Sequence, residues 1–83
     1  MRIGFNVKVA KNIGEKSKET FGEVGTILYL KRILGTCITE FYVDDQYVFQ
    51  VSLPIDTLEE LNHYFKYQMY PEYHTLFKRI EED

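Results

Sequence analysis

Apolar and polar residues alternate along the first part of the chain, up to Val9. The apolar members recur at every second position, and a period of two places their side chains on one face of a strand. These members are Ile3, Phe5, Val7 and Val9. The residues that follow, 11–20, are mostly polar, and we expect them to form a mobile loop.

Residues 22–30 have the pattern of a turn that leads into a second strand. Gly22 and Gly25 supply backbone freedom where the loop enters the sheet. The run ILYL at 27–30 is apolar or aromatic at every position, as in a buried strand. We expect this strand to extend with a bend to about Leu34. Because this run is apolar on both faces, we expect it to be covered on both sides.

Two further strands are predicted at residues 37–43 and 47–52. The residues between them, Asp-Asp-Gln at 44–46, have the length of a hairpin connection. Pro54 cannot donate a hydrogen bond to a sheet, so any fifth strand at residues 53–55 is expected to be very short.

The period changes to three or four residues after Asp56, which predicts helices for residues 56–83. Asp56 and Glu59 have the spacing of a helix cap. The first helix then carries the apolar residues Leu58, Leu61, Phe65 and Met69. Pro71 suits the first turn of a second helix, whose apolar face would contain Tyr73, Leu76, Phe77 and Ile80. The tail is therefore expected to form two short helices or one kinked helix.

Three segments resemble parts of a small SH3-like barrel. The sequence GEVGTI at 22–27 is similar to the glycine-hydrophobe signature of KOW-type modules, GFNVKV at 4–9 resembles their opening strand, and residues 41–49 resemble their strand, acidic turn and strand. The resemblance covers residues 1–55 and implies a five-stranded SH3-like barrel, followed by the two short helices of residues 56–83. The alternative is an α+β fold, in which a four-stranded antiparallel sheet carries both helices on one face.

Length and charge limit what this fold contains. A chain of 83 residues is expected to form a single domain, 1–83. Residues 1–36 contain seven Lys/Arg and three Asp/Glu, whereas residues 37–83 contain three and ten. The two halves can serve two partners or attract each other in the folded molecule. The single Cys37 allows no internal disulfide, and no apolar run is long enough to span a membrane. We therefore expect a cytoplasmic protein.

Tyrosines in the helical tail are the first candidate for a binding site. A helix can bury only one stripe, so some of these rings are expected to be exposed, and exposed tyrosines favour protein contacts. The candidates are Tyr64, Tyr67, Tyr70 and Tyr73. They predict a non-catalytic protein-interaction module, such as a regulator or inhibitor of a larger partner.

Two alternatives involve nucleic acid. The resemblance to KOW-type modules implies binding through the first loop and its surroundings, where basic side chains can contact phosphates. These basic residues are Lys8, Lys11, Lys16, Lys18, Lys31 and Arg32. Alternatively, the acidic tail imitates a phosphate backbone, through Glu59, Glu60, Glu72, Glu81, Glu82 and Asp83.

Catalysis is not indicated by any motif in the chain. His63 and His74 lack the spacing of a helical metal pair. Asp44 and Asp45 suit a turn, and Cys37 has no evident activating neighbour. We therefore predict no enzyme activity, no cofactor and no metal site.

Overall fold

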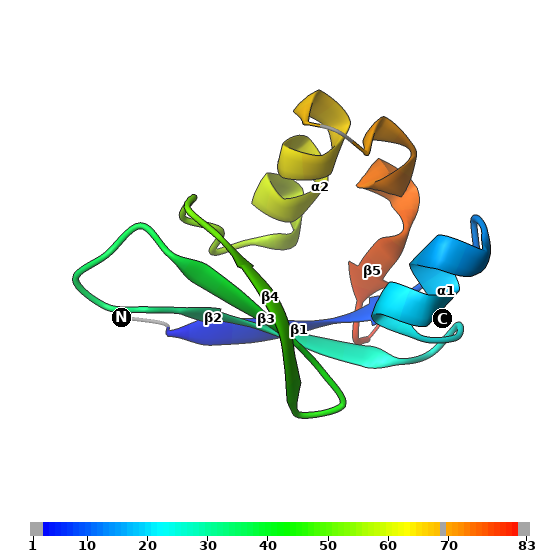
Figure 1. Ribbon diagram of the computed structural model, residues 1–83, viewed down its shortest axis with the longest axis horizontal. Coiled ribbons are helices and arrows are strands. Elements are labelled where there is room, and N and C mark those ends of the chain that lie inside the picture. The colour runs from blue at the N-terminus through cyan, green and yellow to red at the C-terminus, as the bar shows by residue number, and fades with distance from the viewer. Residues whose placement is uncertain (1–2, 69, 82–83) are drawn as a thin grey trace.

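The computed structural model describes residues 3–68 and 70–81, and its main feature is an antiparallel sheet in the order β4-β3-β2-β1-β5 (Figure 1). The strands are Gly4–Val9 (β1), Ile27–Arg32 (β2), Thr39–Val43 (β3), Gln46–Val51 (β4) and Phe77–Arg79 (β5). The sheet is not closed, because β4 and β5 are its two edges. A mainly β fold with helical additions is therefore confirmed, whereas a closed barrel is not.

The first four strands agree with the sequence pattern to within a few residues. The turn between β3 and β4 consists of Asp44 and Asp45, both with positive φ (49° and 66°). Two such residues form the tight turn whose twist matches a hairpin, and aspartate tolerates this conformation better than most residues. This explains how the hairpin closes without glycine.

The predicted loop at residues 11–20 is wrong in part, because it contains the helix Glu15–Phe21 (α1). Only Phe21 and Ser17 of this helix are buried, and the Ser17 hydroxyl donates to the Gly14 carbonyl (2.9 Å). A seven-residue helix with one large apolar anchor lacks the repeated apolar positions by which a helix is found in a sequence. The glycine at its start and the polar spacing suggested a loop instead.

The tail contains one predicted helix, Leu58–Tyr67 (α2), but not the second. Met69, predicted to extend the apolar stripe of the first helix, lies outside the described residues. Residues Pro71–Thr75 form a short 3-10 helix (η1), and the chain then extends into β5. β5 pairs with β1, placing Phe77 opposite Val9. The chain forms no strand at residues 53–55, so the fifth strand comes from the end of the tail. A 3-10 turn followed by a strand buries Tyr73, Leu76 and Phe77 as a helix would, which is why their spacing misled the prediction.

One face of the sheet carries the core. Leu28, Leu30 and Phe41 point to this face and are fully buried, together with Leu61 and Phe65 from α2. Figure 1 shows α2 above the sheet on this side. The opposite face of β2 is open, since Ile27 is 39% exposed and Tyr29 only partly buried. The expectation that β2 is covered on both sides is therefore wrong.

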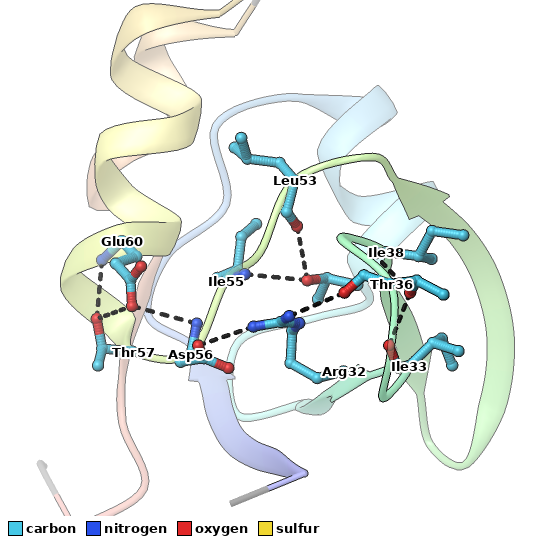
Figure 2. Close-up of polar contacts among 10 residues, drawn as sticks. Arg32, Ile33, Thr36, Ile38, Leu53, Ile55, Asp56, Thr57 and Glu60 are labelled. Carbon is cyan, nitrogen blue, oxygen red and sulfur yellow. Dashed lines mark hydrogen bonds and ion pairs between the residues drawn. The ribbon is translucent and has the colours of Figure 1, made fainter.

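Polar contacts hold the connection between β4 and α2 against the sheet (Figure 2). The buried Thr39 hydroxyl donates to the Leu53 carbonyl (2.7 Å) and accepts from the Ile55 N–H (3.0 Å). The Arg32 guanidinium donates to the Asp56 carboxylate (2.9 Å) and to the carbonyl of Thr36 (3.1 Å). These contacts fix the start of α2 and thereby its position over the core.

Candidate interaction site

Two cavities lie along the open edge of β4, and we refer to them together as the groove. Its first part is a cavity of about 290 Å³, lined by Phe49, Gln50 and Val51 of β4 and by rings from α1, α2 and η1. Its second part, of about 540 Å³, lies against the start of β4 and the turn before it. Thr20 of α1 lines both parts. α1 therefore forms one wall of the groove, and the edge strand forms the other.

The backbone of β4 has hydrogen-bonding groups directed into this groove. The Asp44 N–H donates to the Ile27 carbonyl (3.3 Å). Because hydrogen-bonding directions alternate along a strand, the backbone groups of residues 40, 42 and 44 point to β2. Those of residues 39, 41 and 43 point to β4. The β4 partners of these last three are Gln46, Phe49 and Val51. The N–H and C=O of Gln50 consequently point away from β3.

Within the described residues, β4 pairs only with β3. Edge strands of this kind are often protected by charged residues or proline. The β4 sequence, QYVFQV, contains neither. A bulge is present, because Tyr42 pairs with Tyr47 while Phe41 pairs with Phe49, which leaves Val48 as the extra residue. The part of the edge beyond the bulge remains available for pairing with another strand.

Aromatic rings form the inner wall of the 290 Å³ cavity. Phe21 is central, with its ring centroid 6.2 Å from those of Phe49 and Phe65 and 5.7 Å from that of Tyr73. Tyr70 stacks on Tyr73 with a centroid distance of 5.1 Å. Such a cavity suits an apolar or aromatic side chain.

Burial in this region affects the ionisation of its tyrosines. Burial raises the pKa of Tyr64 above 10.0, with a smaller contribution from neighbouring Tyr70. Burial likewise raises the pKa of Tyr73, followed by the charges of Glu72 and Tyr70. The hydroxyls of Tyr64 and Tyr73 therefore remain protonated at neutral pH and can donate hydrogen bonds.

The four predicted contact tyrosines do not form one exposed cluster. Tyr64, Tyr70 and Tyr73 line the cavity, and Tyr73 is only 8% exposed. Tyr67 is 63% exposed and lies next to the His63 ring (4.5 Å) and the Lys66 ammonium group (5.5 Å). The structure thus brings three of the four together, in a cavity whose Phe21 and Phe49 the sequence did not single out.

The two ends of the groove differ in charge. Glu19 and Asp44 line the 540 Å³ part, whereas Lys16 lines the aromatic cavity. Asp45 follows Asp44 in the exposed turn. A basic group of a bound segment therefore meets acidic side chains near the β3–β4 turn. An apolar group of the same segment meets the aromatic cavity at the other end.

The predicted basic residues lie in separate places. Lys8 and Lys31 alternate with buried strand residues and so lie on the face of the sheet opposite the core. Lys11 and Lys16 are exposed before and within α1. The remaining two are paired, Lys18 with Glu23 (3.2 Å) and Arg32 with Asp56 (2.9 Å). The six residues therefore do not form a single phosphate-binding patch around the first loop.

The acidic tail is similarly divided. Glu59 forms an ion pair with Arg79, and Glu60 accepts hydrogen bonds at the start of α2. Glu72 and Glu81 are exposed, while Glu82 and Asp83 lie outside the described residues. No continuous acidic ridge follows from the residues that can be placed.

Comparison with known proteins gives no match to a family model, a curated protein or a solved structure. In the part of the chain that the structure describes, no three His, Cys, Asp or Glu side chains gather as metal ligands would. Nor does any helix among those residues have the length and apolarity to cross a bilayer.

Proposed function

We propose that this chain is a small non-catalytic protein-interaction module that binds an extended segment of a partner protein along β4. The supporting observation is an edge strand whose outer side pairs with no other described strand and which lies directly beside an aromatic cavity. Recognition by strand addition combines these two features, because backbone hydrogen bonds give affinity and pockets for side chains give specificity. A regulator or inhibitor of a larger protein would act in this way.

The proposed partner segment has a definite chemistry. It carries an apolar or aromatic side chain that enters the cavity bounded by Phe21, Phe49 and Tyr70. Toward the β3–β4 turn it carries a lysine or arginine, opposite Glu19 and Asp44. Its backbone pairs with the outward N–H and C=O of Gln50. Charge at one end and apolar burial at the other would together fix the direction in which the segment binds.

A peptide-display selection against the intact domain tests this proposal, followed by NMR titration of the selected peptides. We expect selected sequences to combine one large apolar residue with a basic residue and to shift the amide signals of residues 49–51. Selection of no binder, or signal shifts confined to other surfaces, would contradict the proposal.

Variants of the groove then locate the binding energy. Tyr70→Ala removes part of the cavity wall and should weaken binding about tenfold or more, as loss of an aromatic anchor does. Tyr67→Ala is the matched control, because its exposed ring lies outside the cavity. Gln50→Pro removes the outward N–H without removing a donor to β3, and proline is tolerated on edge strands. If Tyr70→Ala and Gln50→Pro bound the peptide as tightly as Tyr67→Ala and the intact domain do, binding along β4 would be excluded.

The SH3-like resemblance and a cytoplasmic location belong to the same proposal. The antiparallel arrangement of β1 to β4 and the return of β5 to β1 are compatible with an opened barrel of this kind. The exposed, unpaired Cys37 is compatible with a reducing compartment.

A further inference from the structure

The outer face of the sheet, which is the face opposite the core, carries a row of three tyrosines. Tyr29, Tyr42 and Tyr47 lie opposite one another on β2, β3 and β4. Their ring centroids are 6.4 Å apart between Tyr29 and Tyr42 and 6.0 Å apart between Tyr42 and Tyr47. We call these three residues the tyrosine row.

Local contacts hold two of these rings in place. The Tyr29 ring lies over Gly4, where a Cβ atom on residue 4 would overlap it. The Tyr42 hydroxyl donates to the Glu40 carboxylate (2.9 Å), and this hydrogen bond raises the pKa of Tyr42. The third ring, that of Tyr47, is 53% exposed. The row is therefore an arranged aromatic surface that remains accessible to solvent.

Lysines flank the tyrosine row. Lys8 on β1 lies between the buried Val7 and Val9 and therefore on the outer face. Lys78 on β5 lies directly opposite Lys8 and shares this face. Lys31 lies on the same face, two residues after Tyr29. None of the three forms an ion pair with a described residue. Like charges opposite each other in a sheet are destabilising, and an anion bound between Lys8 and Lys78 would relieve their repulsion.

We propose that the outer face binds single-stranded nucleic acid. Bases stack on the tyrosine row, and Lys8, Lys31 and Lys78 contact the phosphates. Aromatic side chains beside a basic surface are how proteins hold single strands without reading their sequence. An acidic peptide would use the lysines but has no planar groups to stack on the rings, so the combination favours a nucleic acid.

This site lies on the outer face of the sheet rather than around the first loop, although it includes Lys8 and Lys31 of the predicted basic residues. It shares one residue with the groove along β4, because Tyr47 also lines the 540 Å³ part. It draws on residues of all five strands and needs neither α1 nor the aromatic cavity. Among the described strand residues on this face, Glu40 is the only acidic one. It lies opposite Lys31, and its carboxylate accepts the Tyr42 hydrogen bond. The outer face is thus positively charged although the whole chain has a formal net charge of −3.

Fluorescence anisotropy with a short labelled oligothymidylate and with a duplex of equal length tests the proposal, at low and near-physiological salt. We expect the single strand to bind more tightly than the duplex and its affinity to fall with rising salt. Tyr47→Ala should weaken binding roughly tenfold, as loss of a base-stacking ring does. Tyr67→Ala, at an exposed ring on α2, is the control and should bind normally.

The lysines are tested by charge removal. Lys31→Gln and Lys78→Gln should each weaken binding and reduce the slope of log affinity against log salt by about one. Lys11→Gln, in the exposed segment before α1, is the matched control and should leave the slope unchanged. Because these lysines and Tyr47 are partly or largely exposed, their variants should fold, and an NMR spectrum like that of the unaltered chain verifies this.

Three results would overturn the proposal. The first is that the oligonucleotide does not bind at low salt. The second is that single strand and duplex bind equally and Tyr47→Ala has no effect. The third is that polyglutamate, at the same concentration of charges, displaces the oligonucleotide. The last result would identify an acidic protein as the partner. Each result leaves peptide binding along β4 intact, since the groove is measured with separate peptides and separate variants.

Discussion

Thr39 is a small side chain with an unusually large predicted effect on stability. Its buried hydroxyl satisfies both the Leu53 carbonyl and the Ile55 N–H. Thr39→Val keeps the shape but leaves both backbone groups without this partner, and we expect the free energy of unfolding to fall by about 1–3 kcal/mol. Urea denaturation measures the change. Thr75→Val, at an exposed residue, is the control, and equal stability of the two variants would contradict the anchoring role of Thr39.

Tyr64 and Tyr73 predict how stability depends on alkaline pH. Burial raises the pKa of both above 10.0, so as pH rises the unfolded chain loses these protons before the folded chain does. Their contribution is complete below about pH 10 and is lost as pH rises toward the folded-state pKa. Urea denaturation on both sides of pH 10 measures this. The free energy of unfolding should decline less steeply with pH for Tyr64→Phe/Tyr73→Phe than for the control Tyr67→Phe.

Contacts between residues on different strands were harder to predict than the burial of single residues. Alternation correctly placed Val7 and Val9 in the core, because a period of two depends only on local geometry. The tyrosine row could not be found in this way, since it depends on the register between strands. Tyr29, Tyr42 and Tyr47 lie in three separate predicted strands, and sequence spacing alone does not state which residues lie opposite one another.

At the scale of elements, the start of α2 shows a shift of one residue from the prediction. Thr57, rather than Asp56, accepts from the Glu60 N–H (3.1 Å), and the Glu60 carboxylate accepts from the Asp56 N–H (3.3 Å). Asp56 instead pairs with Arg32. Two neighbouring pairs, Asp56/Glu59 and Thr57/Glu60, have the capping spacing in the sequence. Only the tertiary contact between Asp56 and Arg32 distinguishes them.

This cap predicts a measurable loss of stability. Thr57→Ala removes the acceptor for the Glu60 N–H, and we expect it to lower the free energy of unfolding by about 1 kcal/mol. Thr57→Ser retains the acceptor oxygen and should lose much less. Thermal denaturation with circular dichroism compares the two, and an alanine variant as stable as the serine variant would show that the cap contributes nothing.

Elements with repeated local patterns were predictable, and elements defined by distant partners were not. The β3–β4 hairpin and α2 each carry their period within one segment. β5 contains three residues, and its strand geometry results from pairing with β1, about 70 residues earlier in the chain. α1 depends similarly on a single ring, Phe21, that packs against residues from the other end of the sequence.

At the scale of the whole molecule, the charge division along the sequence does not become two charged halves. Lys78, from the acidic second half, joins Lys8 and Lys31 on the outer face, while Glu19, from the basic first half, joins Asp44 in the groove. Arg32 and Asp56 pair across the division. The fold redistributes charge between the outer face and the groove, and these are the two surfaces for which we propose partners.

The tail supplies part of the core, which predicts that residues 1–55 do not fold alone. Of the twelve buried apolar residues described, five lie beyond residue 55, among them Leu61, Phe65 and Phe77. At about 1.5–3 kcal/mol for each large side chain, their burial contributes roughly 10 kcal/mol. That equals the entire stability of a typical domain, about 5–15 kcal/mol. Truncation also removes β5 and exposes the edge of β1.

NMR spectra of residues 1–55 alone should therefore show poor dispersion, and heating should give no cooperative transition. Adding residues 56–83 as a separate peptide should restore dispersed signals for β1, because that peptide supplies β5 and the core side chains of α2. A dispersed spectrum and a sharp transition for residues 1–55 without the peptide would establish the opposite arrangement, in which the first four strands are self-sufficient and the tail only docks on them.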